Sequence, residues 1–374
     1  MSAVKAPLHD LSSRARHLQI SVDAAVTYDL LLVLWAALGG DDKAAEHALG
    51  ATWFDDFRSA LSEQTKALSD RVSPHGVLWA VMLGVIEAAP VGHDLNHVIP
   101  WLETQDPKEM RTRLMSAQFS DFDPDLVAAA AEGDASAVDE LLSQPQMAHK
   151  EPSHTEALRS AFLLPSDEVM TGIIEVMKRA RREAFQPYEA DWTAALARDA
   201  IEKRMAVANA ANPRELIETV SNGISYDVPP GVRRVVIIPS IALRPWTLIT
   251  DSGDGLLVCC PVSEDSLIAD PDAPPAWLVA TYRALGDEKR LRLLRRLAER
   301  PATLAELTEF MGMAKSTVFH HMGVLRAAGL VRVTLSSQDR DKENTTYSLR
   351  FDSIPDRAAL IDLYLNPTAK EIKP

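Results

Sequence analysis

One predicted helix near the C-terminal end of the chain gathers side chains that can donate hydrogen bonds. Apolar residues recur at Val318, Met322 and Leu325 with three- and four-residue spacing, which predicts a helix over residues 315–328 with Gly329 as its C-cap. The side chains away from this stripe are small, polar or basic apart from one phenylalanine, and none is a carboxylate. Such a face suits hydrogen bonding to base edges and phosphates in the major groove of DNA. The contacts predicted on this helix are Lys315, Ser316, Thr317, Phe319, His320, Gly323 and Arg326.

The elements on either side of this helix can position it. A shorter helix is predicted over residues 304–311, with Thr303 as its N-cap and Glu306 completing a capping box. Beyond the second helix, residues 331–335 and 345–349 alternate as strands around a polar loop, which predicts a hairpin, or wing. Helix, turn, helix and wing together form a DNA-binding arrangement. The candidates in or beside the wing for contacts with phosphates or the minor groove are Arg332, Arg340 and Lys342.

Two runs of this region carry a resemblance to a known family. The runs ALGDEKRLRLL (284–294) and STVFHHMGVLRAAGLV (316–331) resemble the winged helix-turn-helix of ArsR-family transcriptional regulators in order and spacing. The resemblance covers residues 276–365 and implies a bacterial repressor that binds operator DNA. The founding metal sensors of the family carry a Cys-x-Cys pair on the helix that corresponds to residues 304–311, and this chain has no cysteine there. A thiolate metal site of that type is therefore absent, and no metal or cofactor is expected.

The resemblance also implies a homodimer. In such proteins the helix before the motif and the helix after the wing pair across a two-fold axis, and here these are residues 277–285 and 357–365. Two recognition helices would then read the half-sites of an inverted repeat about one DNA turn apart. The expected interface residues are Trp277, Tyr282, Leu360, Leu363 and Tyr364.

Charge is unevenly distributed along the chain. Of the 374 residues 25% are charged and the formal net charge is −14, yet residues 276–350 hold 13 Lys and Arg against 8 Asp and Glu. This part therefore carries +5 and the remainder −19. Phosphates would repel the acidic remainder, which favours a sensing or regulatory role for it, with a small-molecule effector as a possible partner.

The expected fold class is mainly α within an α+β arrangement. Residues 18–220 read as mostly helical, and three apolar runs within 224–267 predict a small, at least partly antiparallel sheet. The run PSIALRPW (239–246) resembles the N-terminal domain of some actinobacterial ArsR-like regulators. The predicted division is an N-terminal domain (1–268), a proline-rich linker (269–275), the winged helix (276–365) and a tail (366–374).

Other functions have less support in the sequence. His93 and His97 stand four residues apart, as in a helical zinc site, and a metal hydrolase is one alternative; a capped helix start explains the same residues. No phosphate-binding loop, nucleophile elbow or paired-cysteine pattern is present, so no enzyme is expected. A second alternative is a protein interaction module with a winged helix that does not bind DNA.

Two features of the sequence fit a cytoplasmic protein. Cys259 and Cys260 are adjacent in a predicted strand, and no apolar run is long enough to cross a membrane.

Overall fold

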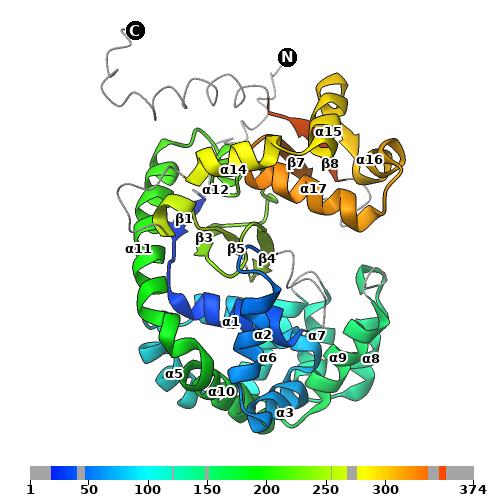
Figure 1. Cartoon of the computed structure of the whole chain (residues 1–374). Coiled ribbons are helices and arrows are strands. Elements are labelled where there is room, and N and C mark those ends of the chain that lie inside the picture. Colours follow the sequence, from blue (N-terminus) through cyan, green and yellow to red (C-terminus); the bar gives the residue numbers. More distant parts are fainter. Residues whose placement is uncertain are drawn as a thin grey trace, which may run out of the picture.

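The computed structural model describes residues 18–39, 47–119, 122–147, 151–253, 255–267, 276–335 and 345–350. These residues form a mostly helical protein with two small mixed sheets, which confirms the expected fold class. A body of helices lies at one end, a four-stranded sheet in the middle and the winged helix at the other end (Figure 1). None of the described helices is both long enough and apolar enough to cross a membrane.

The helical body is built from short helices whose first turns are fixed by aspartate and proline. Asp106, Asp123 and Asp134 each accept hydrogen bonds from backbone N–H groups of the helix that follows. Residues 124–143 form two helices rather than one, because Gly133 between them adopts a φ of 99°. The helices are α1 (Val26–Leu38), α2 (Ala51–Ala60), α3 (Glu63–Val72), α4 (Val77–Glu87), α5 (Leu95–Glu103), α6 (Pro107–Gln118), α7 (Pro124–Ala131), α8 (Ala135–Ser143), α9 (Pro152–Leu163) and α10 (Ser166–Ala180), with the short helical turns η2 (Pro74–Gly76) and η3 (Pro145–Met147).

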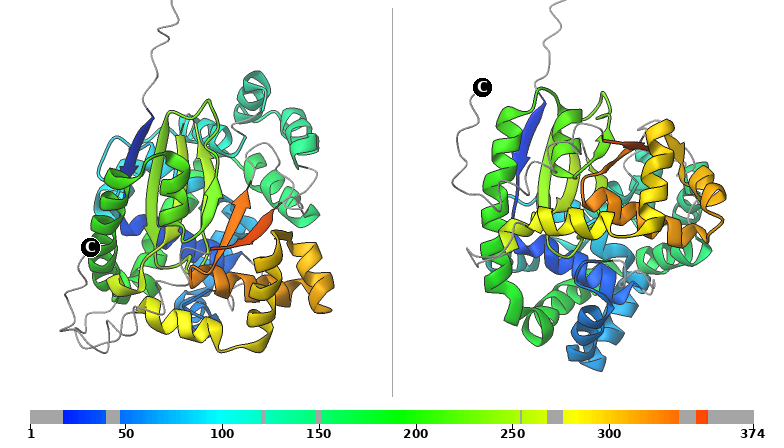
Figure 2. Two further views of the ribbon diagram at one scale, coloured as in Figure 1. Left: turned by 90° about the horizontal axis from the view of Figure 1, so that it is seen from above. Right: turned by 45° about the horizontal axis from the view of Figure 1, so that its top comes forward.

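The middle sheet has the strand order β1-β3-β5-β4. The strands β1 (Gln19–Val22), β3 (Arg234–Ser240) and β5 (Gly255–Pro261) are parallel, and β4 (Leu248–Ser252) pairs with β5 antiparallel at the edge. Because side chains alternate along a strand, one set of β3 side chains joins the core of the helical body and the other packs under helices α11 (Gln186–Asn209) and α12 (Pro213–Val220). The π-helical turn η4 (Arg181–Phe185) connects α10 directly to α11, which has Pro187 in its first turn. Figure 2 shows this sheet from two further directions.

The winged helix has the predicted order of elements. Helices α16 (Leu304–Met311) and α17 (Lys315–Ala327) are followed by the antiparallel strands β7 (Val331–Leu335) and β8 (Thr346–Leu349). The capping box between Thr303 and Glu306 is present. Val318, Met322 and Leu325 are buried in the core of this region, as the periodicity predicts. The remaining elements are α14 (Ala276–Leu285), α15 (Glu288–Glu299), the two-residue strand β6 (Ala302–Thr303) and, before the linker, α13 (Glu264–Leu267).

One further strand joins the wing. The three predicted apolar runs form β3, β4 and β5 of the middle sheet, whereas β2 (Ile224–Tyr226), which the sequence did not predict as a strand, pairs in parallel with β7 of the wing. The second sheet therefore has the order β2-β7-β8-β6, and the N-terminal region contributes its outer strand. Gly223 makes this approach possible, because a Cβ there would lie 2.7 Å from the carbonyl oxygen of Val331 and its φ is +112°.

Candidate nucleic-acid interface

The first turns of α17 face solvent. Lys315, Ser316 and His320 are exposed and Thr317 is half-buried. The turn before them is fixed by Gly312, which ends α16 in the left-handed conformation at a φ of 63°. These side chains supply an ammonium, two hydroxyls and an imidazole on one helix end. Four of the predicted contacts therefore lie together on an accessible surface.

The second half of the same helix face is partly covered, and Phe319 on it remains 36% exposed. The ring of Trp246, from the segment before β4, stacks on Phe319 with centroids 5.1 Å apart and planes inclined by 3°. The same ring lies against Gly323, where a Cβ would come within 2.5 Å of Trp246 Cη2. Glycine at this position is thus explained by close packing against an indole. Phe319 and Gly323 were predicted to contact DNA, and here both contact the N-terminal region instead.

Arg326 is held inside the protein. Its guanidinium donates to the carbonyl oxygens of Pro245 and Ser221, the latter at 3.0 Å, and lies 5.7 Å from the ring centre of Trp246. It is 4% exposed, and burial lowers its pKa to about 10, so it remains charged at neutral pH. The predicted contact of Arg326 with DNA is therefore not available in this conformation, because its guanidinium is buried within the chain.

The wing is attached to the N-terminal region by a second set of contacts. Arg332, a predicted phosphate contact, forms an ion pair with Glu218 of α12 at 2.6 Å. In this conformation its charge is therefore paired within the chain. The side-chain amide of Asn222 donates to the carbonyl oxygen of Ala327 at the end of α17. The other two predicted wing contacts, Arg340 and Lys342, lie outside the described residues.

A buried carboxylate holds the segment that carries Trp246. Asp29, on α1, is 1% exposed and accepts hydrogen bonds from Ser240 Oγ at 2.5 Å and from the backbone N–H groups of Ile241 and Ala242 at 3.1 and 3.2 Å. Three donors at one carboxylate fix the chain where it leaves β3. Burial raises the pKa of Asp29 to about 6 although these hydrogen bonds oppose the shift.

This raised pKa predicts a pH dependence of stability. Between the ordinary pKa of 3.8 and about 6 the folded chain holds one more proton than the unfolded chain, so stability falls as pH rises. We expect the free energy of unfolding of the wild type, relative to that of Asp29→Asn, to fall by about 1 kcal/mol between about pH 5 and about pH 7 in urea titrations. Asp56→Asn, a substitution at an exposed position on α2, is the control and should keep the pH dependence of the wild type. Equal pH dependence in the two variants would contradict the assignment.

The two histidines considered for zinc do not share a helix face. Asp94 is the N-cap of α5 and accepts from the N–H of Asn96, so His93 precedes the helix and only His97 lies in it. His93 pairs with Asp23, and His97 pairs with Asp94 at 2.5 Å. No group of three metal-ligating side chains occurs in the part of the chain that the structure describes. The explanation as a capped helix start is confirmed by this geometry.

Of the predicted dimer residues, one can be placed. Tyr282 on α14 is 46% exposed, and Val279, one turn earlier, is 38% exposed. The side chain of Trp277 and residues Leu360, Leu363 and Tyr364 lie outside what the structure describes. Val279 is not among the predicted interface residues, although its three-residue spacing from Tyr282 places both on one face of the helix.

His320 has the best placement for reading a base. It is exposed on the second turn of α17 and points away from the apolar stripe that contains Val318 and Met322. We expect His320→Ala to weaken operator binding by about 1–3 kcal/mol, the scale of one good base contact. Fluorescence anisotropy with labelled operator measures this loss. His97→Ala, which removes an imidazole from the helical body, is the control, and an equal loss in both variants would count against a base contact.

Comparison with known proteins agrees with this geometry. A family model described as a helix-turn-helix domain matches residues 285–334. The HTH-type transcriptional regulator KmtR of Mycobacterium tuberculosis is 31% identical over 96 residues, which are 26% of this chain and 68% of that protein. The HTH-type transcriptional regulator NmtR of the same organism is 36% identical over 84 residues, or 21% of this chain and 66% of that protein. No solved structure matches the chain. Through its helix-turn-helix region, the chain belongs to the ArsR family of transcriptional regulators.

Proposed function

We propose that the chain is a transcriptional repressor that reads an inverted-repeat operator as a homodimer in the bacterial cytoplasm. The observation that carries this proposal is the exposed start of α17, where Lys315, Ser316 and His320 offer donors and the whole helix has no carboxylate. The basic charge of residues 276–350 supports it, since neutralising phosphates supplies much of the affinity for DNA. No catalytic group takes part in this function.

The dimer in this proposal forms through α14. Val279 and Tyr282 present apolar surface one turn apart on this helix. The sequence of residues 357–365 is rich in leucine and supplies the expected partner helix. Pairing of these two helices across a two-fold axis would place both α17 helices on one side of the dimer.

DNA binding in this proposal requires a rearrangement. Trp246 covers Gly323 and one face of the Phe319 ring, which stays 36% exposed, so the described conformation offers the first turns of α17 and part of Phe319 to a DNA groove. Release of the 245–247 segment would uncover the rest of the helix face. The N-terminal region would then control affinity by changing the population of covered and uncovered forms, which is the effector response we propose for it.

Selection from a random DNA pool by the purified full chain, at about 150 mM salt, tests the proposed function. Enrichment of an inverted repeat with half-sites about one DNA turn apart is the expected result. Failure to enrich any sequence, both for the wild type and for Trp246→Ala, would overturn it. Trp246→Ala is included because a wild type that stays in the covered form would fail to bind DNA even if the proposed function is right.

The alternative is a protein interaction module, which the charge of −19 outside residues 276–350 favours as a docking surface for a basic partner. Salt dependence separates the two functions. A dimer that neutralises about six to ten phosphates should lose about a thousandfold or more in DNA affinity between about 50 and about 200 mM salt. A protein-docking module would show no measurable DNA binding at either concentration.

A further inference from the structure

The N-terminal region contacts the wing through helix α12 and the turn that follows it. Leu216, Ile217 and Val220, on one face of α12, pack on strands of the middle sheet. After the turn, β2 pairs in parallel with β7, and the N–H of Val333 donates to the carbonyl oxygen of Gly223 at 2.7 Å. A packed apolar face and main-chain hydrogen bonds therefore hold α12 beside the wing.

One carboxylate of α12 meets two arginines at the base of the wing. Glu218 Oε1 accepts a hydrogen bond from Nε of Arg332 at 2.6 Å and lies 4.0 Å from Nε of Arg350. Arg332 belongs to β7 and Arg350 directly follows β8, so this carboxylate contacts both strands of the hairpin. Because Val331 and Val333 are buried in the core of the winged helix, strand alternation places Arg332 on the opposite face of the wing sheet, toward α12.

The ion pair between Glu218 and Arg332 is within reach of solvent. The side chain of Arg332 is 36% exposed and that of Glu218 is 16% exposed. A guanidinium binds carboxylates and phosphates with the same N–H groups and in similar geometry. A DNA phosphate can therefore replace the carboxylate by rotation of the arginine side chain, while β2 stays paired with β7.

We propose that Glu218 is an intramolecular competitor of DNA phosphate: its carboxylate holds Arg332 while DNA is absent and gives it up when the operator binds. The N-terminal region meets other predicted DNA contacts with uncharged groups, an indole at Phe319 and carbonyl oxygens at Arg326. At Arg332 its partner carries a negative charge, as a phosphate does. This inference rests on the proposed function and adds a second way in which the N-terminal region controls DNA affinity.

The competitor lowers DNA affinity for two physical reasons. The pairing of β2 with β7 keeps the Glu218 carboxylate at a high effective concentration beside Arg332. The carboxylate also neutralises one positive charge of a surface whose affinity for DNA depends on neutralising phosphates. Removal of its charge makes one further cation available to phosphates in each protomer, which amounts to two in a dimer.

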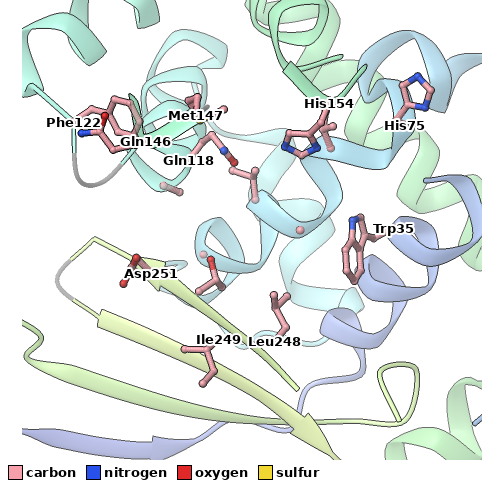
Figure 3. A pocket seen from close by; sticks show the side chains of 16 residues that line it. Trp35, His75, Gln118, Phe122, Gln146, Met147, His154, Leu248, Ile249 and Asp251 are labelled. Carbon is pink, nitrogen blue, oxygen red and sulfur yellow. The ribbon is translucent and has the colours of Figure 1, made fainter. Parts of the chain in front are cut away.

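The Glu218–Arg332 pair is separate from the cover that Trp246 provides. Trp246 precedes β4, and β4 forms one wall of a cavity of about 440 Å³ against the helical body. Figure 3 shows Leu248 on the strand side of this cavity and Gln118 on the side of the helical body. None of the described residues that line it belongs to α12 or to the wing. We therefore expect the effect of Glu218 on DNA affinity to persist after the cover is removed by Trp246→Ala.

Operator titrations of the full chain at two salt concentrations test the competitor, in the wild type and in the Trp246→Ala background. Glu218→Gln keeps the shape of the side chain and removes its charge. In both backgrounds it should bind the operator more tightly at low salt. Each phosphate contact steepens the fall of log affinity with log salt by about 0.9, so two further contacts should reduce this advantage by about tenfold between about 50 and about 200 mM salt.

Two variants separate the competitor from a general effect of charge. Glu215→Gln removes the same charge from an exposed position one turn earlier on α12, where the carboxylate accepts from the N–H of Ala211. It should keep the salt dependence of the wild type. In the background of Arg332→Gln, which lacks the cation to be released, Glu218→Gln should give no gain. No gain in Glu218→Gln, an equal gain in Glu215→Gln, or an undiminished gain without Arg332 would overturn the inference.

Chromatography on heparin separates this inference from the proposed function, because the sulfates of heparin bind guanidinium groups without an operator. Glu218→Gln should elute at higher salt than Glu215→Gln, and circular dichroism should show that both are folded. Later elution of Glu218→Gln from a chain that selects no DNA sequence, even as Trp246→Ala, would contradict the proposed function and leave the competitor in place. Equal elution of the two variants from a chain that does bind an operator would overturn the competitor alone.

Discussion

Replacing Trp246 by alanine is expected to raise the affinity of the full chain for operator DNA by about tenfold or more. The indole stacks on Phe319, lies against Gly323 and forms a cation–π contact with the guanidinium of Arg326. Removing a half-buried tryptophan should destabilise the covered form by about 2 kcal/mol, which changes a population ratio by about thirtyfold. Apparent affinity rises by this factor as long as the covered form predominates. Operator titration by fluorescence anisotropy measures the change.

The matched control is Trp53→Ala. Trp53 is also half-buried and stacks on another aromatic ring, that of Trp192, at 5.5 Å, but it lies in the helical body away from α17. This variant should lower the melting temperature without changing DNA affinity. If Trp246→Ala and Trp53→Ala altered DNA affinity alike, general loosening would explain the effect and the covering role of Trp246 would be wrong.

The winged helix could be predicted closely because its signals are local. The apolar spacing of Val318, Met322 and Leu325, the capping box at Thr303 and the glycine after each helix depend on residues a few positions apart. The structure accordingly begins α17 at the predicted residue and ends it one residue early. Exposure of the first turn of α17 followed from the same periodicity.

The covered half of the interface could not be predicted in this way. Trp246 and Phe319 are far apart in sequence, and a single chain gives no sign that their rings meet. Arg326 has the same side chain whether it binds a phosphate or a carbonyl group, so only its burial decides. Glycine at position 323 suits the close approach of DNA as well as that of an indole. The predicted DNA contacts that instead touch the N-terminal region are thus residues whose chemistry suits either partner.

The pairing of β2 with the wing has a similar cause. Ile224–Tyr226 is too short for its own pattern to select one sheet over the other. What selects it is the positive φ of Gly223 and the hydrogen bond from the N–H of Val333 to the carbonyl oxygen of Gly223, at 2.7 Å. These contacts join residues over a hundred positions apart. The proposed release of the segment with Trp246 would leave this attachment in place.

Ser316→Glu should abolish operator binding, with a fall of about a hundredfold or more in affinity at about 150 mM salt. Ser316 is the exposed second residue of α17, at the end of the helix that is proposed to meet the DNA backbone. A carboxylate there is compatible with the fold, because negative charge is favourable in the first turn of a helix. DNA phosphates repel the same charge. In a dimer each protomer loses this DNA-binding free energy once.

Ser136→Glu provides the matched control, since Ser136 is the exposed second residue of α8 in the helical body. It adds the same charge in the same helical position, far from the proposed interface. Both variants should keep the wild-type circular dichroism spectrum, and only Ser316→Glu should lose DNA binding. Operator affinity within a few-fold of wild type for Ser316→Glu would remove this helix end from the DNA groove. The proposed function would then have to depend on a different surface, because no other described helix end combines these donors with a face free of carboxylates.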